Sequence, residues 1–483
     1  MSERTEGTTS RSERTEGTAS TDLTRLFERA AREAARFRAG LRIRPVAHPV
    51  DLRALRAAFG DQLQRGPRTA DEVLSELLSA AGPGLVATAG PRFFGFVTGG
   101  ALPAASAADV LAVGWDQNAL NPVLSPAALA AEDCAAEWLK DLLGLPPTAS
   151  TGFVTGGQAA NTVGLAAARH AQLAAAGWDV EQDGVGGAPH VRVVVGDERH
   201  ATIDRAVRLL GLGTSSLETV ATDAAGALDV ADLARVLGAR PAGPTIVCLQ
   251  AGNVNTGACD PIRAACEVAH DHDGWVHVDG AFGLWAAASP TTRHLVDGVE
   301  LADSWATDGH KWLNVPYDSG LAFCAHPEIH RAAVSYTASY LVGSDGTQAV
   351  TLAGGTDYVL ESSRRARGFA VWAALRELGR DGVADLVDRM CALTRRFAEG
   401  LAGAGVELAG DPVLNQALAR FGDDDRTDRV IDAVQRDGTC WLGGTTWRDR
   451  RWMRISVSNY TTTEEDVDTS VAAVLRAAVS TSG

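Results

Sequence analysis

The feature that most constrains the fold of this 483-residue chain is a series of short, largely apolar segments separated by helical patterns. Three of these segments, each five residues long, lie at 191–195, 245–249 and 275–279. Runs this short and apolar are typical of strands buried on both faces, and strands that alternate with helices form parallel sheets covered by helices. The alternation extends from about residue 105 to 350, so it predicts an α/β domain with a mostly parallel sheet.

Three further regions flank this alternating part. A polar heptapeptide at residues 2–8 is repeated at 12–18 without a hydrophobic period, which predicts a disordered tail. Helical spacing follows, but its apolar residues are too few to form a core alone, so we expect these helices to pack on another domain or subunit. Patterns after residue 365, including a helix that stops at Gly379, predict a smaller α+β unit. The expected boundaries are 1–21 for the tail, 22–104 for the helical segment, 105–360 for the large domain and 361–483 for the small domain.

Composition excludes several classes of function. The net charge of −16 and the lack of a dense basic run argue against binding to nucleic acid. No apolar stretch reaches the ~18–20 residues that a membrane span needs, and the N-terminus lacks an apolar signal core. The seven dispersed cysteines include no Cys-x-x-Cys pair, so we expect reduced thiols and a cytoplasmic location. His270 and His272 are two positions apart with no third ligand in a helical pattern, so no metal site is expected.

Chemistry is indicated first by Asp279 and Lys311. Asp279 ends the strand predicted at 275–279, and Lys311 follows 32 positions later. Pyridoxal phosphate needs an amine that bonds its aldehyde carbon and an acid that keeps its pyridine nitrogen protonated. Each residue also has an ordinary explanation, because most lysines are solvated surface groups and a buried aspartate can pair with an arginine.

Two more candidates lie where predicted strands end. Gly156, Gly157 and Gln158 follow an apolar segment and open a predicted helix over 158–176, an arrangement in which backbone N–H groups can hold a phosphate. The alternative is a turn that needs glycine, and the ending of a nucleotide P-loop is missing. His200 follows the strand at 191–195 and can stack on a flat heteroaromatic ring, or it can be a solvated or capping histidine.

Three loops carry weaker signals. The loop 251–257, which includes Asn255, offers small and polar groups to a ring oxygen or imine, although ordinary loop chemistry explains it equally well. Tyr340 precedes a run rich in Gly, Ser and Thr that can form a mobile cover carrying an acid group, or the tyrosine can be a packing residue. Arg364 and Arg365 can bind a carboxylate or phosphate, or they can begin a surface helix.

Taken together, these residues resemble the group II pyridoxal-phosphate-dependent amino-acid decarboxylases, the family of aromatic L-amino-acid, histidine and glutamate decarboxylases. The resemblance covers about residues 25–475. Its most specific parts are Pro91-Arg92-Phe93-Phe94, His277-Val278-Asp279, His310-Lys311-Trp312, Ser363-Arg364-Arg365, and Met453-Arg454-Ile455-Ser456 with Asn459.

The resemblance implies the aspartate-aminotransferase-like fold (fold type I), a homodimer and active sites shared between subunits. It makes Lys311 the Schiff-base lysine, Asp279 the partner of the pyridine nitrogen and His200 the residue stacked on the ring. The expected cofactor-binding residues are Gly156, Gly157, Gln158, His200, Asn255, Asp279, Ala281, His310 and Lys311.

Tyr340-Leu341 matches the family's Tyr-Leu on a flexible loop. That tyrosine protonates the carbanion left after carbon dioxide departs, at the partner's site, whereas relatives with phenylalanine there make aldehydes oxidatively. Tyr340 therefore completes the expected catalytic set with Lys311, His200 and Asp279, and favours simple decarboxylation of an amino acid to its amine. The chain departs from better-known members at Gly280-Ala281-Phe282, and at Asp308-Gly309 where many have Asn-Pro.

The substrate and reaction type stay open at this level. Phe94, Phe96 and Trp115 favour an aromatic or other bulky apolar side chain, while charged substrates remain compatible with residues such as Arg92, Asp116 and Arg454. Another pyridoxal enzyme on the same fold, such as an aminotransferase, a lyase or an oxidative aldehyde synthase, is the first alternative. A binding protein that kept the fold without catalysis is the second, and the intact Lys311 argues against it.

Overall fold

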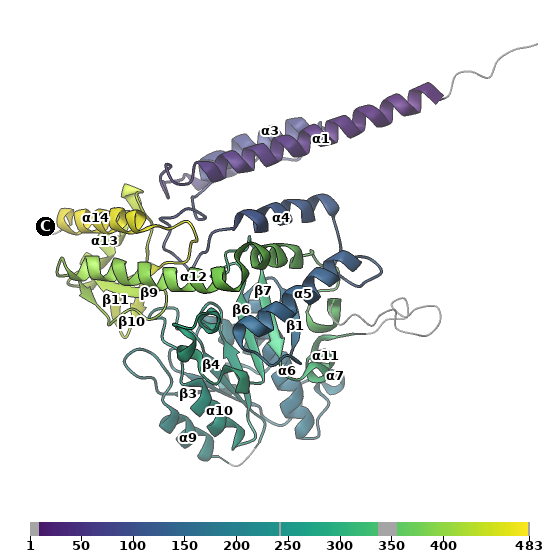
Figure 1. Cartoon of the computed structure of the whole chain (residues 1–483). Coiled ribbons are helices and arrows are strands. Elements are labelled where there is room, and N and C mark those ends of the chain that lie inside the picture. Colours follow the sequence, from purple (N-terminus) through teal and green to yellow (C-terminus); the bar gives the residue numbers. More distant parts are fainter. Residues whose placement is uncertain (1–8, 241–242, 337–354, 482–483) are drawn as a thin grey trace, which may run out of the picture.

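A seven-stranded sheet lies at the centre of the computed structural model, which describes residues 9–240, 243–336 and 355–481 (Figure 1). Its strand order is β1-β7-β6-β5-β4-β2-β3, and only β7 runs antiparallel to its neighbours. The prediction of a mostly parallel sheet is confirmed. The strands are β1 (Ser150–Val154), β2 (Arg192–Gly196), β3 (Leu217–Val220), β4 (Thr245–Gln250), β5 (Trp275–Asp279), β6 (Ser304–Asp308) and β7 (Gly320–Cys324).

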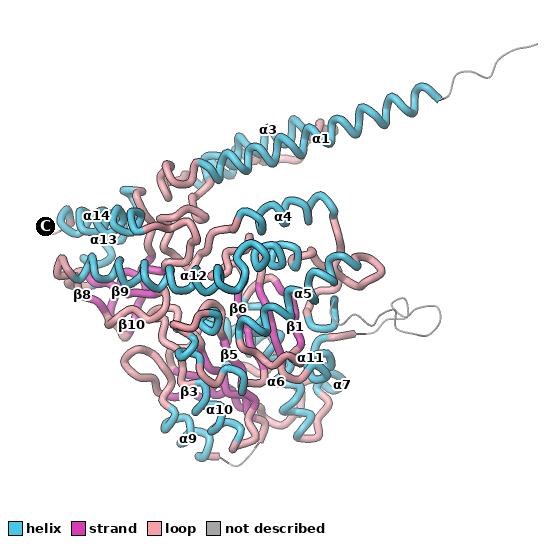
Figure 2. Tube along the Cα trace, viewed as in Figure 1, coloured by secondary structure: helices cyan, strands magenta, loops and turns pink. Residues whose placement is uncertain are grey.

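Helices cover both faces of this sheet, as Figure 2 shows around the magenta strands. Alternate residues of one strand enter different cores: Val276 and Val278 of β5 join the larger cluster, whereas Trp275 joins the cluster formed with α6 and α8. This two-sided burial explains why the strands are apolar at nearly every position. The helices of this region are α5 (Pro126–Leu143), α6 (Gly157–Ala175), α7 (Val180–Asp183), α8 (Ala201–Leu209), α9 (Val230–Gly238), α10 (Ile262–His270) and α11 (Pro327–Val334).

The N-terminal region contributes four helices before this sheet. They are α1 (Thr9–Ala39), α2 (Leu52–Ala58), α3 (Ala70–Ala81) and α4 (Pro103–Trp115). α4 packs on the long helix α12 (Gly368–Ala402), while α1 projects beyond the rest of the molecule (Figure 1). The helix begins at Thr9, so the tail expected over residues 1–21 differs from the structure, where backbone hydrogen bonding extends the helix into the polar repeat.

The C-terminal region forms the expected α+β unit. A four-stranded antiparallel sheet, ordered β10-β11-β9-β8, packs against α12 and α13, and α14 packs on these two helices. α12 is kinked at Gly379, whose φ of 63° is left-handed, so the predicted helix end is a break between two helical parts. The remaining elements are β8 (Glu407–Leu408), β9 (Gln416–Arg420), α13 (Asp424–Asp437), β10 (Gly443–Trp447), β11 (Arg450–Ser456) and α14 (Glu464–Ser480). Among the described helices, none has the length and apolar character needed to cross a bilayer.

Candidate active site

A cavity of about 420 Å³ lies at the carboxyl ends of β4, β5 and β6, the edge of a parallel sheet where ligands gather. Side chains from three strand ends and from the first turns of α6 and α8 converge on it. The lining residues are Gly157, Gln158, Asn161, His200, Thr202, Gln250, Gly252, Val254, Asp279, Ala281, Phe282, Asp308 and Lys311. The structure therefore brings Lys311, Asp279, His200, Gly157, Gln158 and Ala281 together, as the sequence predicted.

Lys311 reaches the cavity from the turn that follows β6. Its Nζ lies 2.8 Å from Asp308 Oδ2, and Asp308 is almost completely buried. The turn is tight because the N–H groups of Gly309 and His310 both donate to the carbonyl of Ser319. Lys311 therefore lies on a turn held by two backbone hydrogen bonds and has an acidic neighbour, Asp308, which the sequence revealed only as a departure from the family pattern.

Asp279 is the buried acid at the end of β5. Its carboxylate accepts two long hydrogen bonds of 3.3 Å, from Thr202 Oγ1 and from the N–H of Ala281. Within residues 9–240, 243–336 and 355–481, no lysine, arginine or histidine forms an ion pair with it, so the alternative of a salt bridge to an arginine is not realised. A buried carboxylate without a cation is unfavourable, and the protonated nitrogen of a pyridine ring is one group that would supply the missing charge.

His200 stands at the start of α8. Its Nδ1 accepts the N–H of Thr202 at 3.3 Å, so the residue caps the helix and lines the cavity at once. Burial lowers the pKa of His200, while the charge of Asp279 acts in the opposite direction. The imidazole is therefore neutral near pH 7, and a neutral ring stacks on a cationic heterocycle without charge repulsion.

A hydrogen-bond chain behind the cavity holds Asp279 and was missed by sequence reasoning. Asn161 Nδ2 donates to Thr202 Oγ1 at 3.1 Å, and Asn161 Oδ1 accepts from His277 Nε2 at 3.0 Å. Burial lowers the pKa of His277 to about 4, so this histidine is a neutral donor. Asn161 was a visible signal, because it lies four residues after Gly157 and therefore on the same face of α6.

The N-terminus of α6 faces the turn that carries Lys311. The N–H of Gly157 donates to Asp308 Oδ1 at 2.5 Å, and Gln158 Nε2 donates to the carbonyl of Thr202 at 3.2 Å. A Cβ atom at Gly157 would approach Asp308 Oδ2 to 2.9 Å, so glycine is needed there for close approach. Backbone N–H groups and the positive end of the helix dipole suit a phosphate.

The other predicted residues lie at varying distances from the cavity. Asn255 Oδ1 accepts from Thr445 Oγ1 at 2.9 Å, so its side chain faces the C-terminal region and does not line the cavity. His310 lies outside the lining as well, with Nδ1 accepting the N–H of Ser319 at 3.2 Å and Nε2 3.4 Å from Asp308 Oδ1. Tyr340 lies outside the described residues.

The paired arginines bind carboxylates of the protein itself. Arg364 forms a buried bidentate pair with Glu132, with N···O distances of 2.7 and 2.5 Å. Arg365 pairs with Asp109 at 2.7 Å on the surface. The hypothesis that this segment binds a free carboxylate or phosphate is therefore wrong for these two guanidinium groups, because each already pairs with a carboxylate of the protein.

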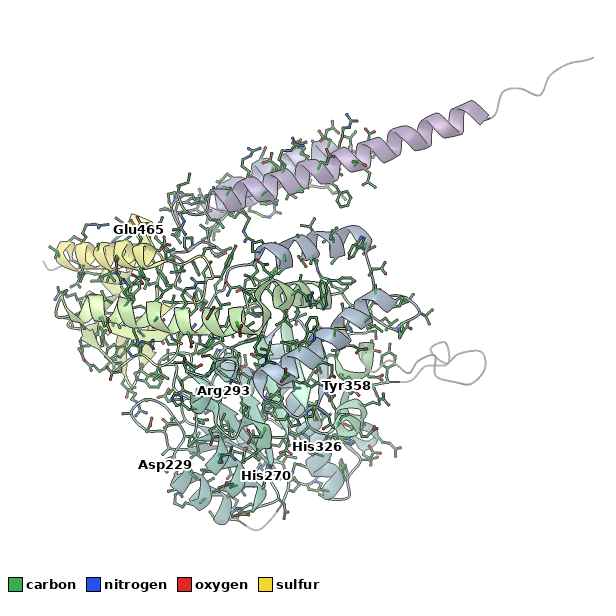
Figure 3. The ribbon with its side chains drawn as sticks, in the orientation of Figure 1. Asp229, His270, Arg293, His326, Tyr358 and Glu465 are labelled. Atoms are coloured by element: carbon green, nitrogen blue, oxygen red, sulfur yellow. The ribbon has the colours of Figure 1, made fainter. Side chains whose placement is uncertain are left out.

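The histidines dismissed as metal ligands have protein partners. His270 Nε2 lies 3.1 Å from Asp303, which also contacts His326, near the lower end of the molecule in Figure 3. His272 Nδ1 lies 2.9 Å from the carbonyl of Val268. Among the described residues, no three His, Cys, Asp or Glu side chains are grouped so that they could hold a metal ion.

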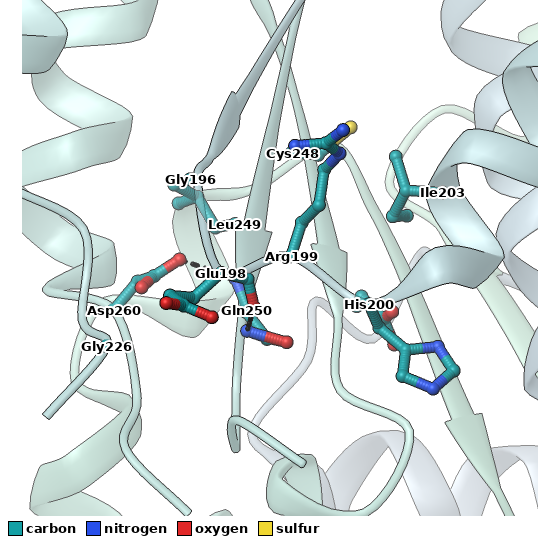
Figure 4. A pocket seen from close by; sticks show the side chains of 11 residues that line it. Gly196, Glu198, Arg199, His200, Ile203, Gly226, Cys248, Leu249, Gln250 and Asp260 are labelled. Atoms are coloured by element: carbon teal, nitrogen blue, oxygen red, sulfur yellow. Dashed lines mark hydrogen bonds between the residues drawn. The ribbon is translucent and has the colours of Figure 1, made fainter. Parts of the chain in front are cut away.

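A smaller cavity of about 310 Å³ adjoins the first and shares His200, Gln250 and Asp279 with it (Figure 4). The carboxylate of Asp260 accepts the N–H groups of Leu228 and Gln250 at 2.8 and 2.7 Å. The His200 ring points away from Asp260 in this view, and His200 also lines the larger cavity. The larger cavity is therefore the one in which the amine, the acid and the aromatic face meet, and its residues fit pyridoxal phosphate.

Comparison with known proteins decides the family. The model of the pyridoxal-dependent decarboxylase conserved domain matches residues 52–408, which is most of the chain. This chain belongs to the pyridoxal-dependent decarboxylase family. The match includes every predicted site residue, from Gly156 to Tyr340, and it confirms both the resemblance and the expected cofactor.

Individual relatives agree with this assignment. Tryptophan decarboxylase 1 of Oryza sativa subsp. japonica is 32% identical over 342 residues, covering 66% of this chain and 65% of the rice protein, slightly under two thirds of its length. Aromatic-L-amino-acid decarboxylase of Bacillus atrophaeus is 26% identical over 448 residues, covering 88% of this chain and 89% of that protein. A phenylacetaldehyde synthase of Petunia hybrida is 26% identical over 366 residues, covering 74% and 71%.

Solved structures share the fold of this pyridoxal-dependent decarboxylase. Oryza sativa TDC, crystallised with PLP and tryptamine, superposes with a TM-score of 0.87 at 24% identity, over 95% of this chain and 98% of that chain. Mouse CSAD superposes with a TM-score of 0.82 at 23% identity, over 90% and 93%. The predicted fold type I architecture is confirmed.

Proposed function

We propose that this decarboxylase removes the α-carboxyl group of an L-amino acid with an aromatic or other bulky apolar side chain, releasing carbon dioxide and the amine. One observation carries the proposal: Lys311 and the buried, cation-free carboxylate of Asp279 line the same cavity. When bound, pyridoxal phosphate supplies an electron-accepting ring that stabilises the charge left as carbon dioxide departs.

Each residue has a defined task in this proposal. Lys311 holds the aldehyde end, and Asp279 keeps a proton on the ring nitrogen by opposing its charge. The neutral imidazole of His200 covers one face of the ring and excludes water from it. The N–H groups of Gly157 and Gln158 hold the phosphate. Tyr340 remains the predicted proton donor to the substrate's α-carbon.

The aromatic preference is supported mainly by the relatives, whose names include tryptophan, tyrosine/DOPA and aromatic-L-amino-acid decarboxylases. Of the aromatic residues considered, Phe94 is buried against Phe397 at a centroid distance of 5.3 Å and is not free to line a substrate pocket. Phe96 is exposed and stacked on Trp441 at 5.3 Å, so it is available to a ligand or a second subunit. Arg92 is occupied by Asp466 and by backbone carbonyls, which disfavours a role for it with an acidic substrate.

The test is a screen of the purified protein with each proteinogenic amino acid, with carbon dioxide, amine and carbonyl products measured in parallel. Stoichiometric amine and carbon dioxide from an aromatic substrate are expected, with no turnover by Lys311→Ala. A keto acid in place of carbon dioxide would replace the proposal with transamination. An aldehyde with hydrogen peroxide would favour the oxidative alternative, which the match to phenylacetaldehyde synthases keeps in view.

We also propose that two copies of the chain assemble and share active sites. Apolar side chains that remain exposed concentrate on the N-terminal helices and the loop after α4, including Leu23, Phe27, Leu77, Val113 and Trp115. A second copy that covers this surface would explain why it is apolar. Sedimentation should give twice the mass of one chain. Lys311→Ala and Tyr340→Phe should each fail to form the amine, and mixing them should restore part of the amine formation, because one site of the mixed dimer then has both residues.

The proposed location is the cytoplasm. All seven cysteines are free in the structure, and six of them are at least partly buried. Unpaired thiols of this kind suit a reducing compartment. Fractionation of the native host with thiol labelling tests the proposal, and recovery of disulfide-linked protein from an exported fraction would contradict it.

A further inference from the structure

Asp308 is the ionisable residue of the cavity to which the proposed mechanism gives no task. It is 1% exposed, and three groups surround its carboxylate. Lys311 Nζ lies 2.8 Å from Oδ2, the N–H of Gly157 donates to Oδ1 at 2.5 Å, and His310 Nε2 lies 3.4 Å from Oδ1. The carboxylate therefore bridges the cofactor lysine and the first turn of α6.

This position is the one in which an incoming phosphate is expected. The first-turn N–H groups of α6 attract an anion, and the carboxylate of Asp308 already acts as that anion toward Gly157. A phosphate dianion beside the buried carboxylate of Asp308 is repelled strongly, because the low dielectric of a buried site screens charges weakly. The repulsion increases once the nitrogen of Lys311 is used to hold the cofactor, since Lys311 is then a weaker partner for Asp308.

We propose that Asp308 couples binding of the cofactor's phosphate to the uptake of one proton from solvent. The proton is held among the phosphate and the groups around Asp308 while the phosphate is bound. A proton within this cluster offsets the repulsion between the two negative charges. The inference depends on the cofactor assignment but not on which reaction the enzyme catalyses.

The other titratable groups facing Asp308 come from four elements. They are His310 and Lys311 after β6, His200 at the start of α8, Tyr317 in the loop before β7 and Asp279 at the end of β5. Burial lowers the pKa of both His200 and His310, so either is a competing site for a proton that a phosphate brings in. Replacement of Asp308 by asparagine removes the charge that repels the phosphate, whichever group carries the proton, and asparagine can still accept the N–H of Gly157.

The experiment measures proton uptake on binding of pyridoxal 5′-phosphate by titration calorimetry at pH 7.5–8.5, in buffers of different ionisation enthalpy. Phosphate groups are fully ionised there, because their second pKa is ~6. Wild-type protein should take up about one proton more than Asp308→Asn. For each unit of pH, its Kd for pyridoxal 5′-phosphate should therefore rise about tenfold more than the Kd of Asp308→Asn. Asp303→Asn is the matched control. Asp303 flanks the opposite end of β6 and pairs with His270 and His326, so its replacement should leave the proton count unchanged.

A comparison within the wild-type protein covers the case in which Asp308→Asn does not fold. Pyridoxal, which lacks the phosphate, should bind with about one proton fewer than pyridoxal 5′-phosphate. Equal proton uptake by wild type and Asp308→Asn, or by the two ligands, would overturn the inference and leave the cofactor assignment intact. No binding of pyridoxal 5′-phosphate to wild-type protein, seen as no change in visible absorbance, would overturn both.

Discussion

The buried pair of Glu132 and Arg364 allows a quantitative test of how this fold is held together. The two side chains are 6% and 1% exposed and form two parallel N–H···O contacts. Removing one member leaves the other charge buried without a partner, which costs about 3–5 kcal/mol. Arg364→Met should therefore destabilise the protein by that amount. Arg365→Met, which removes a surface pair with Asp109, should cost at most ~1 kcal/mol.

Thermal unfolding converts these free energies into measurable shifts. A cooperative unit of 483 residues has an unfolding entropy of about 1 kcal/mol/K, so Arg364→Met should lower Tm by about 3–5 °C and Arg365→Met by ~1 °C or less. The double variant Glu132→Met/Arg364→Met should recover most of the loss, because no unpaired charge remains. Equal shifts for Arg364→Met and Arg365→Met, or additive losses in the double variant, would refute this account. A rise in the Kd of the cofactor without a change in Tm would instead assign Arg364 to ligand binding.

Three further outcomes follow from the site. Asp279→Asn should keep the visible absorbance of bound cofactor but lower kcat by about 10²–10³, since it removes the charge opposing the ring nitrogen; an unchanged kcat would contradict that role. Gly157→Ala should weaken cofactor binding at least ~10-fold, measured by absorbance titration, because its Cβ would lie 2.9 Å from Asp308 Oδ2. Burial lowers the pKa of His277 and of His330 to about 4. Folding stability that is present above pH 6.5 should therefore be lost as the pH falls toward 4, by at most about 3 kcal/mol for each residue. Calorimetry should give a lower Tm at pH 5 than at pH 7, and equal Tm values would contradict the prediction.

The sheet was predictable because its strands obey a local rule. β2, β4 and β5 are apolar on both faces, and each was predicted within about two residues of its observed ends. β7 (Gly320–Cys324) was not among the strands predicted. It is the antiparallel member of the sheet and pairs with both β1 and β6, and its position depends on contacts that no local pattern encodes.

The residues of the candidate site likewise divide into those that the sequence predicted and those that it did not. Lys311 and Asp279 were predictable because each has a chemical reason to lie where a strand ends. Thr202 was not, because its role arises only when α8 and α6 meet behind Asp279. Asn161 was missed although its spacing from Gly157 places it on the same face of α6. For Arg364 the sequence left a ligand contact and a surface helix start open, since a sequence cannot show that the partner of an arginine lies 232 positions earlier in the chain.

Two acids at the edge of the sheet, Asp279 and Asp308, lie in the same cavity but have different partners. β5 and β6 are parallel neighbours in which Asp279 is paired with Ala306, so Asp308 extends two residues beyond that pair on the same edge. Asp308 pairs with Lys311 and the start of α6, whereas Asp279 has only a hydroxyl and one N–H. Asp308 thus lies where a phosphate would compete with it for the start of α6. Asp279 lies where a cationic ring nitrogen would pair with it. The parallel pairing of β5 and β6 fixes the positions of both acids. The proposed roles of Asp279, as the partner of the ring nitrogen, and of Asp308, in proton uptake, therefore both depend on this pairing.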